Sequence, residues 1–150
     1  WSGLKNSDLA EKVTTQKNYI WKGFKTWRKE HGYRKNNQNS FHVVAIDYGI
    51  KKNILRYFSD FKCKVTVVSC KTSAEKILSL KPNGVFLSNG PGDPAATGKY
   101  AIEILNKLIK KRSFGVSLRE VWVSRVWGSR VSSHGFRISG STYPFSLEAL

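Results

Sequence analysis

Apolar and polar residues follow two different rhythms along the middle of the chain. Short continuous apolar runs, such as 43–46, are typical of strands that are buried on both faces of a parallel sheet. Between these runs, Ile50, Ile54 and Phe58 recur at helical spacing, which predicts an amphipathic helix. The whole pattern predicts strand 43–46, helix 50–58, strand 65–68, helix 72–80, strand 85–87 and helix 100–111. This alternation indicates an α/β fold with a doubly wound parallel sheet.

Two of the predicted helices carry signals for their ends or their buried faces. Thr72 and Glu75 have the spacing of a capping box, in which each side chain accepts a hydrogen bond from the backbone N–H of the other residue. In helix 100–111 the apolar spacing predicts that Ile102, Leu105 and Ile109 face the core.

A turn cluster follows the third predicted strand and is the most informative motif of the chain. Residues 85–94 read Val-Phe-Leu-Ser-Asn-Gly-Pro-Gly-Asp-Pro. The order strand, turn, helix places this cluster at the carboxyl edge of the sheet, where α/β proteins bind ligands. Gly90 and Gly92 lack a Cβ, so their backbone N–H groups can approach a small anion closely. A tight connector without a ligand is the alternative interpretation.

Composition narrows the class of protein. With 150 residues, 40% of them hydrophobic, the chain can form one ordinary packed domain. The net charge of +16 suggests an acidic partner, nucleic acid or an anionic membrane surface, but the lysines spread over 5–111 indicate a solvated surface rather than a nucleic-acid site.

No apolar run of the sequence is long enough to span a membrane. The flanks of strand 64–68 lie about 20 Å apart, too far for Cys63 and Cys70 to form a disulfide, so we expect reduced thiols and a cytoplasmic protein.

The first 40 residues lack the regular alternation of the middle of the chain. We expect 1–40 to be a linker with transient helix, in which Trp21, Phe24 and Trp27 form an apolar stripe surrounded by basic residues. Such a stripe favours packing on a neighbouring domain, and contact with nucleic acid stays the alternative. The chain begins at Trp1 and contains no Met, so we expect it to be a fragment of a longer protein.

Several segments together resemble the class I glutamine amidotransferase domain of carbamoyl phosphate synthetase. They are Phe-His-Val-Val-Ala-Ile-Asp-Tyr-Gly-Ile-Lys-Lys-Asn-Ile-Leu at 41–55, Cys-Lys-Val-Thr-Val-Val at 63–68, Thr-Ser-Ala-Glu at 72–75 and Leu-Ser-Asn-Gly-Pro-Gly-Asp-Pro at 87–94. The resemblance covers 41–111, and 3–15 is similar to the stretch that precedes this domain in the family. It implies a fold of the class I amidotransferase type, incomplete at its C-terminal side. We therefore divide the chain into the linker 1–40, the N-terminal half of an amidotransferase domain at 41–111, and an aberrant or diverged tail at 112–150.

The resemblance also implies a chemistry. These domains release ammonia from glutamine with a Cys–His–Glu triad, and two backbone N–H groups stabilise the oxyanion. The ammonia passes to a large synthetase subunit, or to a synthetase region of the same polypeptide, which uses bicarbonate and ATP. ATP and Mg belong to that partner, and we expect no cofactor and no metal site in this chain.

The family's site residues can be transferred to a few positions only. Gly90 and Gly92 match its glutamine-contacting glycines, and Gly90 would be one oxyanion donor. Ser117 stands at the position of the nucleophilic Cys, with Leu118 as the second oxyanion donor. The match then fails, because Arg-Glu-Val at 119–121 replaces Gly-His-Gln. A serine hydroxyl is a far weaker acid than a thiol, so we expect this chain to be inactive as a glutaminase.

The other residue types of a triad are poorly placed. His134 follows Ser117 too soon, His31 lies in the linker and His42 begins a strand, so surface or capping roles are expected for all three. Asp47 ends a strand, and we expect it to form the turn there.

Residue usage changes near position 112. Lysine, asparagine, aspartate, glutamine and cysteine are absent from 113–150. We favour a translation of unrelated nucleotides for this tail, and a diverged amidotransferase sequence is the alternative. The family's fourth strand, which precedes Phe114, lacks its Ile-Pro. We therefore expect the sheet to end in an open edge after strand 85–87.

The functional interpretation is the glutaminase part of carbamoyl phosphate synthetase. Two alternatives stay open: a non-catalytic scaffold domain that docks on the synthetase, and a basic nucleic-acid-binding fragment.

Overall fold

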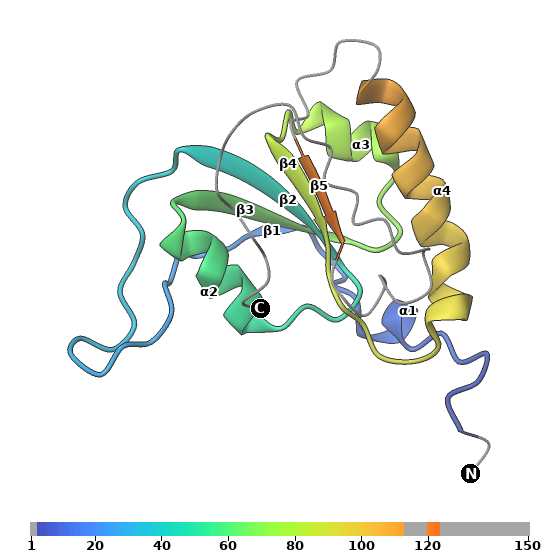
Figure 1. Ribbon diagram of the computed structural model, residues 1–150, viewed down its shortest axis with the longest axis horizontal. Helices are drawn as coiled ribbons and strands as arrows, with labels where there is room; N and C mark the ends of the chain where they lie inside the picture. Colours follow the sequence, from blue (N-terminus) through green and yellow to red (C-terminus); the bar gives the residue numbers. More distant parts are fainter. Residues whose placement is uncertain (1–2, 113–119, 124–150) are drawn as a thin grey trace.

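The computed structural model describes residues 3–112 and 120–123 of the chain (Figure 1). Strands and helices alternate as the sequence predicts. In chain order they are α1 (Ala10–Val13), β1 (Tyr19–Ile20), β2 (Phe41–Asp47), α2 (Lys52–Asp60), β3 (Cys63–Ser69), α3 (Ala74–Ser79), β4 (Gly84–Leu87), α4 (Pro94–Arg112) and β5 (Glu120–Val123).

The described strands form one sheet in the order β1-β3-β2-β4-β5. β1 pairs antiparallel with β3, and the other three pairs are parallel. α2 covers one face of the sheet, and α3 and α4 cover the other (Figure 1). This doubly wound α/β arrangement confirms the predicted fold class.

Both faces of the central strand β2 are buried, which explains its continuous apolar sequence. Val44 and Ile46 belong to the core cluster under α3 and α4, whereas Val43 and Ala45 belong to the cluster under α2. Successive side chains of a strand point to opposite faces, so an uninterrupted apolar run supplies both clusters.

The buried face predicted for α2 is confirmed, whereas the one predicted for α4 is wrong at one residue. In α2, Leu55 is buried and is joined in its cluster by the partly buried Ile50, Ile54 and Phe58, as predicted. In α4 the prediction for Ile102 is wrong, because 48% of this residue is exposed. Leu108 of this helix is fully buried, and Leu105 packs partly buried against the same core cluster.

The starts of two helices also differ from the sequence prediction. α3 begins one residue later than the capping box requires, because Ser73 is its N-cap and the Ser73 Oγ accepts the Lys76 N–H at 3.3 Å. α4 begins at Pro94, six residues before the predicted start at 100. Proline is favoured in the first turn of a helix, where its missing N–H costs nothing.

The sheet does not end in an open edge at β4. Strand β5 pairs in parallel along all four residues of β4, from Gly84 opposite Glu120 to Leu87 opposite Val123. The resemblance placed this strand before Phe114, but residues 110–113 are Lys-Lys-Arg-Ser and too polar for a strand beside β4. The sequence Val-Trp-Val at 121–123 has the composition that strands prefer.

The segment before β2 takes part in this fold. Ala10 is buried in the core, and β1 forms the antiparallel edge of the sheet. The predicted helical stripe of aromatic residues does not form, because the chain is extended here and Phe24 bridges to Lys35. Trp21 packs against the α2-side core, whereas Trp27 is 57% exposed. The division at residues 40 and 112 into separate units stays a prediction.

Candidate functional site

The loop between β4 and α4 lies at the carboxyl edge of the parallel strands, as the sequence predicts. Ser88, which is fully buried, joins the ends of two strands there. Its N–H donates to the Ile46 carbonyl at 3.1 Å, and its Oγ accepts the Tyr48 N–H at 2.9 Å. The loop is therefore held at a fixed position over the end of β2.

Both glycines of this loop are required by close packing. A Cβ at Gly90 would lie 2.3 Å from the Tyr48 carbonyl oxygen. Gly92 has a φ of +92°, and its Cβ would lie 2.4 Å from the Ser7 carbonyl oxygen. Within the ranges 3–112 and 120–123, the N–H groups of Gly90 and Gly92 donate no hydrogen bond. The loop thus presents backbone donors that are free to bind a ligand.

Asn89 adds a second polar group at this edge. Its Oδ1 atom is buried and has no hydrogen-bond partner in the described part of the chain. Its backbone carbonyl accepts the Ser88 hydroxyl at 2.8 Å. A buried amide oxygen without a partner is costly in a folded protein, so it marks a place where a donor is expected to bind.

Asp47 organises the neighbouring turn, in agreement with the structural role expected for it. Its Oδ1 accepts the N–H groups of Gly49 and Ile50, both at 2.8 Å. Its Oδ2 accepts the Thr15 N–H at 2.9 Å, and its carbonyl accepts the Thr14 hydroxyl at 2.6 Å. These donors occupy the carboxylate, which leaves it no evident catalytic role.

Residues 6–9 form one wall of the site, which sequence reasoning missed by treating the segment as a linker. The Asp93 carboxylate accepts the Asn6 N–H at 2.9 Å, and the Asp93 N–H donates to the Ser7 carbonyl at 2.9 Å. Asp93 also accepts the Ala95 N–H and so caps α4. The similarity of 3–15 to the family was the signal that could have placed this segment against the domain.

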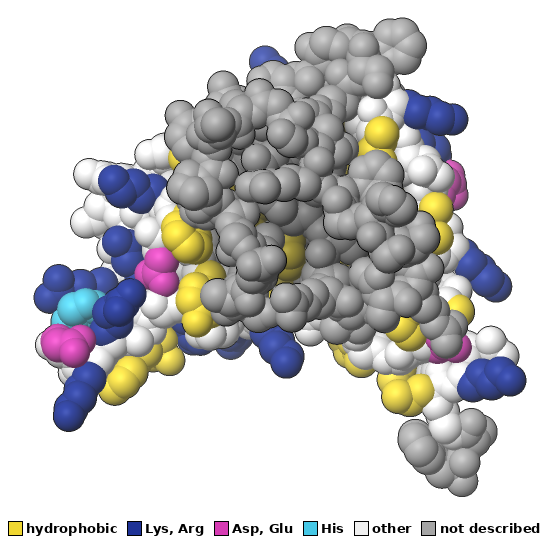
Figure 2. Space-filling model, in the orientation of Figure 1, with side chains coloured by type: hydrophobic (Ala, Val, Ile, Leu, Met, Phe, Trp, Pro, Cys, Tyr) yellow, Lys and Arg dark blue, Asp and Glu magenta, His cyan; other side chains and the backbone are white. Residues whose placement is uncertain are grey.

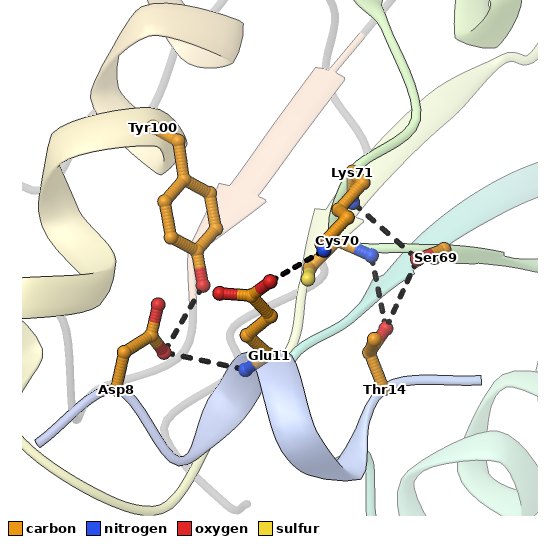
Figure 3. A network of polar contacts seen from close by, with 7 residues as sticks. All are labelled: Asp8, Glu11, Thr14, Ser69, Cys70, Lys71 and Tyr100. Atoms are coloured by element: carbon orange, nitrogen blue, oxygen red, sulfur yellow. Dashed lines mark hydrogen bonds and ion pairs between the residues drawn. The ribbon is translucent and has the colours of Figure 1, made fainter. Parts of the chain in front are cut away.

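Figure 3 shows the hydrogen bonds and the ion pair that join residues 8–14 to α4 and to the end of β3. The Asp8 carboxylate accepts the Tyr100 hydroxyl at 3.3 Å, as drawn there, and it also accepts the Thr97 hydroxyl at 3.2 Å. The Thr14 hydroxyl accepts the Cys70 N–H at 3.0 Å, and Glu11 forms an ion pair with Lys71. These hydrogen bonds join residues that are more than 50 positions apart in sequence.

Neither described cysteine has the properties of an activated nucleophile. Burial raises the pKa of the Cys63 thiol to about 11. Burial is also the main cause that raises the pKa of Cys70, which is fully buried at the end of β3. A catalytic cysteine needs a lowered pKa and access to its substrate, so neither residue replaces the family nucleophile.

The described histidines lie away from the loop. His42 is at the amino end of β2, opposite Lys64 of β3, and its Nε2 is 2.8 Å from the Thr66 hydroxyl. Burial lowers the pKa of His42, and the nearby Lys64 lowers it further. His31 is exposed at the tip of the segment that joins β1 to β2. His134 lies outside the described residues, as do Ser117 and Leu118.

Glu120 and Val121 stand where the family has the His and Gln that follow its nucleophile. Both lie in strand β5, and Glu120 pairs with Gly84 at the amino end of β4. The structure therefore does not place these two positions in a helix at the carboxyl edge, where the family has the helix that follows its nucleophile.

Among the described helices, none could serve as a membrane span.

Comparison with known proteins identifies the family. The family described as Glutamine amidotransferase class-I matches residues 44–148. The carbamoyl phosphate synthase small chain of Rhizobium meliloti is 44% identical over 148 residues, which cover 96% of this chain and 37% of the relative. The protein of the same name from Bradyrhizobium diazoefficiens is 44% identical over 150 residues, which cover 99% of this chain and 38% of the relative. The chain thus spans less than two fifths of the length of these relatives.

The family match extends into the tail at 112–150. A match that runs to residue 148 includes most of 112–150, which we expected to be unrelated to the family. The two origins predicted for this tail, a translation of unrelated nucleotides and a diverged amidotransferase sequence, both stay predictions. The chain belongs to the class I glutamine amidotransferase family, and its curated relatives are small chains of carbamoyl phosphate synthase.

Proposed function

We propose that this chain is the glutaminase part of a glutamine-hydrolysing carbamoyl phosphate synthetase. In the family this part releases ammonia that a large synthetase partner uses, and in this chain the loop 88–94 binds the side-chain amide of glutamine. ATP and Mg bind to that partner, and the chain acts in the cytoplasm, where its two free cysteines stay reduced.

The free N–H of Gly90 is the observation that carries this proposal. It lies at the carboxyl edge of the sheet and donates no hydrogen bond within the described residues. An N–H held by a rigid loop can stabilise the oxyanion that forms when a nucleophile attacks the amide. The buried Asn89 Oδ1 offers an acceptor for an N–H of the substrate.

The chain itself is proposed to bind glutamine without hydrolysing it. Ser117 stands at the nucleophile position, and its hydroxyl ionises far less readily than a thiol. The thiols of Cys63 and Cys70 both have raised pKa values, and neither described histidine lies beside the loop. These observations favour the second candidate, a scaffold domain that docks on the synthetase and does no chemistry.

Glutamine binding is tested by nuclear magnetic resonance. Titration with glutamine should shift the amide resonances of Gly90 and Gly92, whereas the amide of Gly3 serves as an internal control. Asparagine, which is one methylene shorter, should shift them much less. No change at Gly90 with millimolar glutamine would contradict the proposed site.

Hydrolysis is tested by ammonia release from glutamine, with the Rhizobium meliloti small chain as the positive control. We expect no ammonia above the buffer blank from this chain or from its Ser117→Cys variant, because Arg-Glu-Val at 119–121 replaces the Gly-His-Gln that follows the nucleophile in the family. Ammonia release that the Gly90→Val change abolishes would show that the chain is an active glutaminase.

A salt titration with a DNA oligonucleotide tests the nucleic-acid alternative, since phosphate contacts make the binding affinity depend steeply on salt concentration.

A further inference from the structure

Residues 24–35 form a hairpin that projects from the sheet, and we call it the basic arm. It lies between β1 and β2 and extends away from both (Figure 1). Antiparallel bridges join Phe24 to Lys35 and Arg28 to Gly32, so the arm is a two-stranded loop outside the main sheet.

The arm is held in one conformation by its own hydrogen bonds and by α2. The Lys25 N–H donates to the Arg34 carbonyl at 2.7 Å. The Thr26 hydroxyl donates to the Asp60 carboxylate at 2.6 Å, where α2 ends. The Arg56 guanidinium stacks over the Tyr33 ring, 4.6 Å from its centre. A preformed loop loses little conformational entropy when it binds, which favours a role in recognition.

The surface of the arm combines positive charge with exposed aromatic rings. The segment contains five Lys or Arg residues and one acidic residue, Glu30. Trp27 is 57% exposed and Tyr33 is 52% exposed. Figure 2 shows a dense group of Lys and Arg side chains around a histidine at the end of the molecule that carries the arm. Exposed tryptophan and arginine are the residue types that contribute most to protein interfaces.

The cations of the arm form no ion pair within the described residues, although the Lys35 ammonium lies 5.7 Å from the centre of the Phe24 ring. The described ion pairs join Lys71 to Glu11 and Lys107 to Glu103, and both are distant in sequence from the arm. The five cations, Lys25, Arg28, Lys29, Arg34 and Lys35, make no ion pair with a described carboxylate. Their positive field is therefore available to an external acidic surface.

The arm lies at the opposite edge of the sheet from the candidate site. α2 leaves the carboxyl end of β2 and runs back, so that Asp60, which anchors the arm, lies just before the amino end of β3. Gly90 follows the carboxyl end of β4. A partner bound to the arm therefore leaves the loop 88–94 accessible.

We propose that the basic arm docks on an acidic recess of the synthetase chain, with Trp27 in an apolar pocket and Arg28 and Lys29 paired with carboxylates around it. The identity of the partner rests on the proposed function. A second copy of this chain is disfavoured, because two molecules of charge +16 repel each other. A nucleic acid strand is disfavoured too, because stacking needs open ring faces along a groove, and Arg56 covers one face of Tyr33.

The test measures binding of the full chain to the large chain of the Rhizobium meliloti enzyme by surface plasmon resonance. Two arm variants, Trp27→Ala and Arg28→Gln/Lys29→Gln, are compared with controls on α4, Ile102→Ala and Lys99→Gln/Lys110→Gln. The control residues are exposed and lie outside the arm. Each arm variant should weaken binding at least about tenfold, and the double charge variant should also reduce the salt dependence of association. The controls should stay within about twofold.

Three results would overturn the inference in different ways. If the chain binds and the arm variants bind equally well, the arm is not the docking element and the proposed function stands. If the unaltered chain does not bind the large chain, the proposed partner fails and the inference fails with it. If the arm variants lose binding to a single-stranded oligonucleotide but not to the large chain, the arm is a nucleic-acid site. Circular dichroism of each variant excludes loss of folding as the cause.

Discussion

A Cβ at position 90 would lie 2.3 Å from the carbonyl oxygen of Tyr48 and 3.0 Å from the Tyr48 Cβ. The loop after β4 can therefore cross the turn after β2 only if residue 90 is a glycine. Because the φ of Gly90 is not in the left-handed region, the need for glycine comes from close approach and not from backbone conformation. The packing that fixes the position of the Gly90 N–H is the same packing that forbids a side chain there.

Gly90→Ala is expected to destabilise the protein by at least about 2 kcal/mol, because the clash is with backbone atoms that cannot move away. Gly3→Ala is the matched control. A Cβ at Gly3 would have nothing within 4 Å, and the φ of +74° costs only about 1 kcal/mol of strain. Urea unfolding followed by circular dichroism measures both. Equal midpoints for the two variants would contradict the close approach.

Asp47→Ala should cost about 3 kcal/mol, since it leaves three backbone N–H groups at the carboxyl edge without their acceptor. Glu103→Ala is the control, because this carboxylate is exposed and its ion pair within the described residues is with Lys107, one helical turn away. Such a surface pair contributes about 0.3 to 0.5 kcal/mol. A loss below about 1 kcal/mol for Asp47→Ala would mean that water replaces the carboxylate without penalty.

His42 is expected to make stability depend on pH. Burial and the charge of Lys64 lower its pKa in the folded state below the ordinary value of 6.5. As pH falls below about 6.5, the imidazole takes up a proton in the unfolded chain before it does so in the folded protein. Protonation therefore favours unfolding, and stability decreases toward acidic pH through this residue.

The measurement compares urea midpoints between about pH 5 and pH 7.5 for the unaltered chain and His42→Gln. The variant should lose less stability than the unaltered chain as the pH falls through this range. Parallel curves would show that the His42 pKa is the same in the folded and unfolded states.

The two cysteines should react slowly with thiol reagents while the protein is folded. With a pKa of about 11, Cys63 is almost entirely protonated at pH 8. Its reaction with Ellman's reagent should then be roughly 100-fold slower than in denaturant. Cys70 is fully buried and should be slower again. Cys63→Ser and Cys70→Ser assign the two phases, and rapid reaction of either thiol in the folded protein would contradict its environment.

The periodicity of the sequence predicted the sheet and its helices because the central strands are buried on both faces. The run 43–46 could only be a strand that supplies two cores, and its neighbours in the sheet have the same character. The carboxyl-edge loop could be predicted for the same reason, since chain order alone places it there.

The errors occur where long-range contacts override local pattern. Ile102 has the spacing of a buried residue, but α4 begins earlier and is rotated so that Leu108 points into the core. The role of Asp8 could not be inferred from residues near it, because its partners Thr97 and Tyr100 are in α4. Tertiary packing decides such positions, and a local window of sequence does not contain it.

The hydrogen bonds that join residues 6–8 to residues 93–100 affect the order in which contacts form while the chain is being synthesised. Asp8 is separated by 89 and 92 residues from the hydroxyls that it binds, and Asn6 by 87 residues from Asp93. At roughly 5 to 20 residues per second, the ribosome needs on the order of 5 to 20 s to produce these partners after the segment has been made. Throughout that interval Asn6 and Asp8 lack their partners, although Thr14 can already bind Asp47 and Cys70. The contacts of Asn6 and Asp8 with residues 93–100 are therefore expected to form later than those of Thr14 with β2 and β3.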